Sequence, residues 1–379
     1  MLTISSGLAL TPSGWRQGDI YIRNGVLAEE PGRSDRLDAQ GLLVLPGMVD
    51  IHGDAFERQI MPRPGVNFDL GVAMRETDRQ LVANGITTAL HGVTNSWEPG
   101  LRSIENARAL VLLLADLRGR TACDMRLHLR HETFNLNAEE ETLRWIADGL
   151  VDALAFNDHM RGIVLGTTIK ASKMQGMVER SGLAKSEFMA LVEATLLREP
   201  EIPASVERLA AAAGRKGVPL LSHDDRDIAD RRAYRALGCA ISEFPMTEEV
   251  ASEALSHREA NVFGAPNVLR GGSHTGCPAA ADMARKGLCN ILASDYFYPA
   301  LLEAPFRLAF EKITPLHEAW AMVSENPARA LGLADRGVIA SGKRGDLVLV
   351  EDCAGAPRLV ATIVAGEIVW ASDWKRVKA

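Results

Sequence analysis

Eight short apolar runs, each ending in polar residues, are spaced along the middle of the sequence. They are VDIH, GITTALHGV, MRLHLRHE, DALAFNDH, VPLLSHDD, AISEFP, NVFGAP and NILASDY. Segments with helical periodicity, such as SIENARALVLLLADLRG, separate several of them. Eight strands that alternate with helices are typical of a (β/α)8 barrel, so we predict an α/β fold built on a TIM-like barrel. A doubly wound open sheet is the alternative, and the sequence lacks the GxGxxG turn that would favour it.

Both ends of the chain are rich in predicted strands. The first part contains short β-type segments and an Asn24-Gly25 hairpin signal, and the last part alternates β-branched residues with glycine-containing turns. We therefore predict that residues 1–47 and 336–379 form one small β-sandwich domain and that residues 48–335 form the barrel. A chain of 379 residues is long enough for both.

The composition excludes several classes of protein. The chain is 47% hydrophobic and 24% charged, which is typical of a folded globular protein. Its net charge of −7 provides no general basic surface, so we expect neither a nucleic-acid nor a membrane partner. Five scattered cysteines without a CxxC pair, together with a start that lacks a signal-peptide pattern, indicate a cytoplasmic protein. The sequence leaves homo-oligomer formation open.

Residue types that bind metal ions stand at the ends of five predicted strands. These candidates are His52, Asp54, Glu132, His159, His223 and Asp295. A parallel barrel assembles its site at the carboxyl ends of its strands, so we expect the six side chains to converge. His52 and Asp54 are two residues apart on one strand and therefore project from one face. Taken singly, such a histidine is more often a buried structural residue than a ligand, and the alternative for each aspartate is a helix or turn cap.

The run from Arg126 to Glu132 alternates polar and apolar residues. Arg126, His128, Arg130 and Glu132 share one face, which predicts either a solvated edge strand or an inner barrel strand whose charges are paired or metal-bound.

Anion-binding residues are predicted near the same end of the barrel. The glycine-rich stretch from Arg270 to Gly276 can offer backbone N–H groups together with Arg270, Ser273 and His274. Arg58 and Arg63 follow the first predicted strand and can add positive charge. A flexible loop and ordinary surface arginines are the alternative interpretation.

The order of these segments resembles the amidohydrolase superfamily. The resemblance rests on a β-rich start that leads into LPGMVDIHGD, a final strand ending in aspartate, the helix SENPARALGL and the tail RGVIASGKRGDLVLV. The segments HLRHE, NDH, SHDD, SEFP, GAPNVLRGGSHTG and SDYFYPALLEAPFR resemble the ribose methylphosphonate triphosphate diphosphatases of phosphonate metabolism. The match runs from about Leu2 to Val369.

The resemblance implies a divalent metal centre of one or two ions. By analogy, His52 and Asp54 are the first-strand ligand pair, Glu132 is a bridging carboxylate, and His159 and His223 are the two barrel histidines. Asp295 is both a ligand and the base. Mixed nitrogen and oxygen ligands suit Zn²⁺, with Mn²⁺ as the alternative. The segments that follow Asp54 and His159 depart from the family pattern.

We therefore predict a metal-dependent hydrolase with a small phosphorylated substrate. The favoured reaction splits alpha-D-ribose 1-methylphosphonate 5-triphosphate into 5-phospho-ribose 1-methylphosphonate and pyrophosphate. Asp295 takes the proton of the attacking water, and Arg270 and His274 hold phosphate charge. Hydrolysis of an amide or cyclic amide is one alternative. A catalytically silent scaffold protein is the other.

Overall fold

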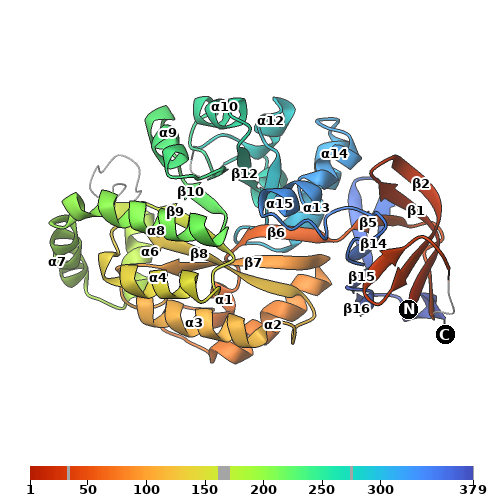
Figure 1. Cartoon of the computed structure of the whole chain (residues 1–379), viewed down its shortest axis with the longest axis horizontal. Helices are drawn as coiled ribbons and strands as arrows, with labels where there is room; N and C mark the ends of the chain where they lie inside the picture. The colour runs from red at the N-terminus through yellow and green to blue at the C-terminus, as the bar shows by residue number, and fades with distance from the viewer. Residues whose placement is uncertain (32–34, 161–170, 274–275, 379) are drawn as a thin grey trace.

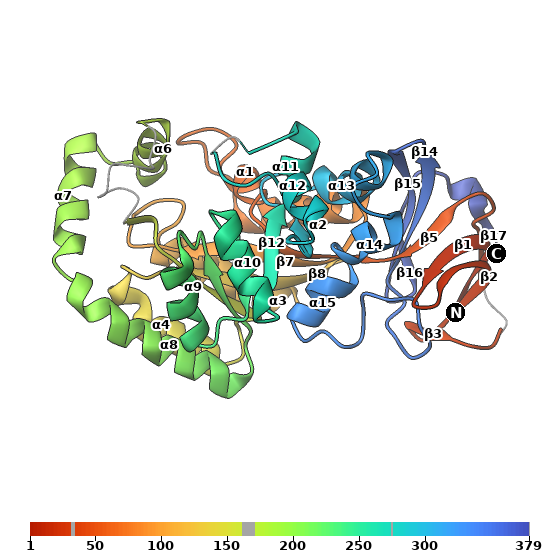
Figure 2. The same ribbon diagram turned by 90° about the horizontal axis from the view of Figure 1, so that it is seen from above.

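Two β-structures organise the chain in the computed structural model, which describes residues 1–31, 35–160, 171–273 and 276–378. Eight parallel strands form a barrel-like sheet surrounded by helices, and nine strands from the two chain ends form a second sheet (Figure 1). Both termini lie in this second sheet, at the opposite end of the molecule from α7 (Lys185–Leu196) (Figures 1 and 2).

All eight predicted runs are strands of the parallel sheet, and each pairs with its neighbour in chain order. The strands are β6 (Met48–Gly53), β7 (Ile86–Asn95), β8 (Asp124–Glu132), β9 (Ala153–Asn157), β10 (Leu220–His223), β11 (Ile241–Glu243), β12 (Ala260–Gly264) and β13 (Ile291–Ala293). This order confirms the (β/α)8 prediction.

Helices connect successive strands and cover the outside of the barrel (Figure 2). Besides α7 they are α1 (Glu57–Ile60), α2 (Leu70–Ala83), α3 (Ile104–Leu117), α4 (Glu139–Ala147), α6 (Ala171–Ser181), α8 (Ile202–Lys216), α9 (Ile228–Ala236), α10 (Glu248–Ser256), α11 (Ala265–Arg270), α12 (Ala280–Arg285), α13 (Pro299–Phe310), α14 (Leu316–Ala321) and α15 (Glu325–Ala330). Local capping fixes several starts: the Ser103 hydroxyl accepts a hydrogen bond from Asn106 N at the start of α3. Among the described residues, no helix is long and apolar enough to cross a membrane.

The first and last strands close the barrel and bring two predicted ligands together. Asp295 N donates to His52 O, and Asp54 N donates to Asp295 O, both at 2.9 Å. The buried carboxylate of Asp50 joins the same seam, because it accepts hydrogen bonds from Ser294 N at 3.0 Å and Ser294 Oγ at 2.5 Å. Asp295 is therefore fixed beside the β6 end by backbone pairing.

The barrel interior has an apolar layer below a polar one. Side chains such as Leu221 and Ile241 belong to a buried cluster drawn from most of the strands. Two residues further along the same strands, His223 and Glu243 point to the same face, because side chains alternate along a strand. The carboxyl ends of these strands consequently carry polar groups next to this apolar layer.

The second sheet is continuous in its hydrogen bonding. Its strands are β1 (Leu2–Thr11), β2 (Gly14–Arg23), β3 (Val26–Ala28), β4 (Asp35–Asp38), β5 (Leu43–Pro46), β14 (Leu347–Cys353), β15 (Ala356–Val364), β16 (Glu367–Ala371) and β17 (Val377–Lys378). The predicted Asn24-Gly25 turn joins β2 to β3 with φ values of 52° and 79°, the left-handed conformation that these residues tolerate. Gly345 N donates to Gly25 O at 2.7 Å, so the sheet curls back on itself around its own apolar core.

This sheet packs directly on the barrel. Thr362 Oγ1 of β15 donates to Val82 O of α2 at 2.7 Å, and Trp320 Nε1 of α14 donates to Pro46 O at 3.0 Å. Arg336 donates to the Asp124 carboxylate at the start of β8 at 2.6 Å. The amino-terminal end of the barrel is thereby tied to the linking segment, which leaves the carboxyl ends of the strands for the site.

Candidate active site

Five of the six predicted ligands fall into two groups at the carboxyl ends of the barrel strands. One ligand atom each of His52, Asp54 and Asp295 lie within 4.8 Å of one another. The same holds for His159, His223 and Asp224. The two groups adjoin, because the His52 and His223 rings are 5.5 Å apart between centroids.

Glu132, the sixth predicted ligand, contacts His159. Its Oε1 is 2.5 Å from His159 Nδ1, and its Oε2 accepts a hydrogen bond from His159 N at 3.2 Å. A carboxylate on Nδ1 leaves Nε2 of the same ring as the ligand atom. In this arrangement Glu132 orients His159, and its role as a bridging ligand stays a prediction.

Glu243 and His128 are site residues that the sequence analysis did not assign. The carboxylate of Glu243 is fully buried on β11, and its Oε1 is 3.0 Å from His52 Nδ1. Its Oε2 is 3.5 Å from His128 Nε2. Among the described residues, neither of these last two atoms has a hydrogen-bond partner. A glutamate inside the apolar run AISEFP was the signal available in the sequence.

Arg130 lies between the two ligand groups. Its side chain is 5% exposed, with Nη1 3.4 Å from Asp54 Oδ2 and Nη2 3.3 Å from His223 Nε2. The strand alternation predicted for β8 is therefore that of an inner barrel strand, with its polar face directed into the site.

A second arginine approaches Asp54 from the loop after β7. Arg102 forms a bidentate ion pair with Glu57, from Nε to Oε1 at 2.9 Å and from Nη2 to Oε2 at 2.8 Å. Its Nη2 is also 3.9 Å from Asp54 Oδ2. Both guanidinium groups therefore approach the same carboxylate oxygen, Oδ2 of Asp54. Arg102 was not among the predicted site residues.

Two of the predicted substrate-binding arginines meet at one tyrosine. Arg270 Nη1 donates to the hydroxyl of Tyr296 at 3.2 Å, and the Arg58 guanidinium lies 5.7 Å from the centre of the same ring. Tyr296 directly follows Asp295, so both exposed arginines stand at the edge of the metal-ligand cluster.

For the remaining predicted substrate-binding residues, the structure gives no contact with the candidate metal ligands among the described residues. Arg63 lies in the exposed segment after α1, where its carbonyl accepts from Val66 N at 3.0 Å. Ser273 is half-buried just beyond α11, and His274 lies outside the described residues. The glycine-rich stretch begins at the end of this helix and not at the end of β12.

Burial and charge set the protonation of the cluster. Burial, followed by the nearby charge of Asp54, raises the pKa of Asp295 from 3.8 to about 7. Burial and then the charge of Arg130 lower the pKa of His52 well below its usual value, which favours a neutral ring. Burial alone would raise the pKa of Glu132, but the contact with His159 lowers it to about 2. The site thus combines a neutral His52 imidazole, the Glu132 carboxylate and the Asp295 carboxyl group, whose pKa is raised.

The donor set fits a divalent metal ion. Imidazole nitrogens and carboxylate oxygens converge from several strands, as zinc and manganese sites require. Nε2 of His128 and Oε2 of Glu243 are buried and lie 3.5 Å apart, but neither forms a hydrogen bond with the described residues, so both atoms can still bind a further group.

Comparison with known proteins agrees with this geometry. The amidohydrolase family model matches residues 73–370, which is most of the chain. The chain belongs to the amidohydrolase family. It is 33% identical over 345 residues to the alpha-D-ribose 1-methylphosphonate 5-triphosphate diphosphatase of Escherichia coli strain K12, with 88% of this chain and 90% of that enzyme covered. The chain is therefore a metal-dependent hydrolase.

More distant proteins are also similar to the chain, in sequence or in structure. An adenine deaminase of Methylobacterium nodulans is 26% identical over 344 residues, which cover 87% of this amidohydrolase and 50% of the deaminase. A prolidase solved with N-methylphosphonate-L-proline has a TM-score of 0.65 at 12% identity, covering 98% of this chain and 100% of its own. A Xaa-Pro dipeptidase with bound methionine has the same TM-score at 14% identity, with equal coverage. The two solved structures establish the shared fold.

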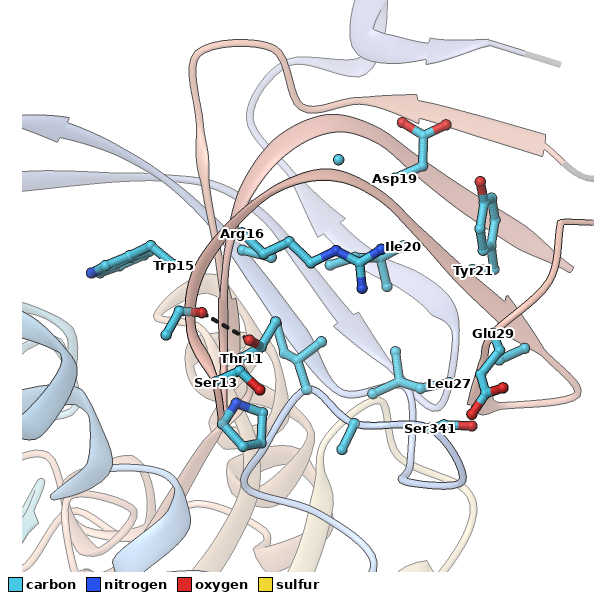
Figure 3. A pocket seen from close by; sticks show the side chains of 17 residues that line it. Thr11, Ser13, Trp15, Arg16, Asp19, Ile20, Tyr21, Leu27, Glu29 and Ser341 are labelled. Carbon is cyan, nitrogen blue, oxygen red and sulfur yellow. Dashed lines mark hydrogen bonds between the residues drawn. The ribbon is translucent and has the colours of Figure 1, made fainter.

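A separate pocket of ≈780 Å³ lies in the terminal sheet of this amidohydrolase. Figure 3 shows Arg16, Ile20 and Leu27 among the residues that line it, together with Ser341 from the segment before β14. None of the predicted site residues is among the described residues that line it. The candidate active site is therefore at the carboxyl ends of the barrel strands and not in this pocket.

Proposed function

We propose that this amidohydrolase is a diphosphatase that splits alpha-D-ribose 1-methylphosphonate 5-triphosphate into 5-phospho-ribose 1-methylphosphonate and pyrophosphate. The observation that carries the proposal is the 33% identity to a diphosphatase of this specificity along 88% of the chain. The cluster at the barrel end supports it, because polar and basic groups there surround a set of metal-binding side chains.

We infer that the metal ligands come from among His52, Asp54, His159, His223 and Asp295, with Zn²⁺ preferred and Mn²⁺ as the alternative. When bound, such an ion supplies Lewis acidity and lowers the pKa of a coordinated water from ~15.7 towards ~7. Glu243 fixes the His52 ring by accepting from Nδ1–H, and Glu132 does the same for His159.

In the reaction, the oxygen of water bonds to the phosphorus of the first phosphate, the one attached to the ribose. The bond from that phosphorus to the oxygen bridging the first and second phosphates breaks. The proton of that water passes to a carboxylate oxygen of Asp295. The leaving group is pyrophosphate, which carries the electron pair of the broken bond. Burial and the nearby charge of Asp54 raise the pKa of the Asp295 carboxyl, which makes its carboxylate a better acceptor for this proton.

Phosphate charge is held by basic side chains at the rim. Arg58 and Arg270 both contact Tyr296, the residue that follows the proposed base. Their guanidinium groups match the geometry of phosphate oxygens and stabilise the charge of the leaving pyrophosphate.

Substitution of the base tests the assignment of Asp295. We expect Asp295→Asn to reduce pyrophosphate release by roughly 10² or more while the bound metal measured by elemental analysis is retained. The matched control is Asp282→Asn, which changes an exposed carboxylate on α12 that pairs with Arg285. Near-normal turnover of Asp295→Asn with the control unchanged would remove Asp295 as the base.

A further inference from the structure

An arginine occupies the centre of the candidate metal site. Arg130 is on the inner face of β8, and its side chain is 5% exposed. Gly92 on the neighbouring β7 makes room for it, because a Cβ at position 92 would lie 3.1 Å from Arg130 Cδ. The absence of a side chain at Gly92 therefore leaves space for the buried side chain of Arg130.

The contacts of this guanidinium reach both groups of candidate ligands. Nη1 lies 3.4 Å from Asp54 Oδ2, which belongs to the first group, and Nη2 lies 3.3 Å from His223 Nε2, which belongs to the second. Asn157 supports the remaining edge: in the amide orientation that satisfies both side chains, its oxygen accepts from Nε and Nη2 at 3.2 Å. Arg130 is therefore fixed between the groups from three sides.

The charge of Arg130 is permanent, because a guanidinium is not deprotonated in proteins. Two divalent ions held by the two groups would stand on either side of this positive charge at short range. Repulsion between like charges is strong where water is largely excluded. Nη1 carries two hydrogens and, among the described residues, makes one contact, to Asp54, so its second hydrogen can be donated to a phosphate oxygen.

We propose that the Arg130 guanidinium takes the place of a second metal ion, so that the centre holds one ion and Arg130 binds the phosphate chain of the substrate. The identity of that substrate rests on the proposed function. The ion count does not, since it follows from the position of the guanidinium between the ligand groups.

Counting metal ions tests the first half of the proposal. Wild-type protein, Arg130→Met and Arg130→Lys are loaded with zinc or manganese, freed of excess ion and analysed by elemental analysis and titration calorimetry. We expect one ion per chain for the wild type and for Arg130→Lys, and a second binding event for Arg130→Met. The matched control is Arg126→Met, on the same face of β8 but paired with Asp124 at the other end of the strand. Two ions in the wild type, or one in a folded Arg130→Met, would overturn the inference.

Binding of inorganic tripolyphosphate to the metal-loaded proteins tests the second half. We expect Arg130→Met to weaken this binding by roughly tenfold or more, Arg130→Lys to weaken it less, and Arg126→Met to leave it unchanged. Equal affinity in wild type and Arg130→Met would overturn the phosphate-binding role. Because this probe is not the substrate, a wild type that releases no pyrophosphate would refute the proposed function and leave this result standing.

Discussion

A buried ion pair behind the active site gives a sharp prediction about stability. Asp225 follows the site residues His223 and Asp224, and its carboxylate is fully buried. Oδ2 accepts from Ser222 Oγ at 2.7 Å and pairs with Arg231 Nη1 at 3.0 Å. Arg231 is itself fully buried on α9.

Removing Arg231 leaves a buried carboxylate without its counter-charge. Breaking a buried pair by deleting one partner costs about 3–5 kcal/mol of unfolding free energy. Two hydroxyl donors, Ser222 and Ser242, remain on Asp225, so we expect Arg231→Met to lie at the lower end, about 3 kcal/mol. The change also removes a hydrogen-bond donor from Cys239 O, which accepts from Arg231 Nη2 at 2.6 Å.

Urea unfolding followed by both tryptophan fluorescence and circular dichroism measures this loss, provided that the two transitions coincide. The control is Arg232→Met, one residue along α9, where the pair with Glu253 leaves the arginine 65% exposed. Such a pair contributes less than about 1 kcal/mol. If Arg231→Met were no less stable than Arg232→Met, the reasoning about buried charge would be refuted.

Two further predictions concern buried groups near the site. Glu243→Gln should weaken metal binding by about 10- to 100-fold in a chelator competition, because the carboxylate orients His52; unchanged affinity would exclude that role. Burial lowers the pKa of His91 from 6.5 to about 3. Below pH ~6.5 the unfolded chain therefore binds a proton that the folded chain does not, so the unfolding free energy falls as the pH decreases. When the pH is lowered from 7.5 to 5.5, the unfolding free energy of His91→Leu should therefore fall by about 1.4 kcal/mol less than that of the wild type. An equal fall in both proteins would show that the pKa of His91 is not lowered in the folded state.

The repeating strand and helix pattern was sufficient to predict the barrel. Each of the eight runs is an apolar strand between helices, and the polar residue that ends a run marks the functional edge of the sheet. The pairing of Asp295 with His52 and Asp54 follows from the same rule, because the first and last strands of a closed barrel are neighbours.

Other features of the site depend on contacts that a single sequence does not contain. β11 has only three residues, too few for an alternation that would reveal the inward direction of Glu243. Alternation placed Arg130 on the polar face of β8, but its position between Asp54 and His223 arises from three strands meeting in space. The domain boundaries at residues 47 and 336 and the role of His274 stay predictions.

Pyrophosphate release by the purified protein tests the central claim most directly. The substrate is alpha-D-ribose 1-methylphosphonate 5-triphosphate, supplied to protein reconstituted with zinc or manganese and, in parallel, to protein stripped by a chelator. The account predicts release of pyrophosphate by the reconstituted protein, loss of release on stripping, and recovery when the ion is returned. A metal-loaded, folded protein that releases no pyrophosphate would contradict the account and direct the search to amides and other phosphate esters.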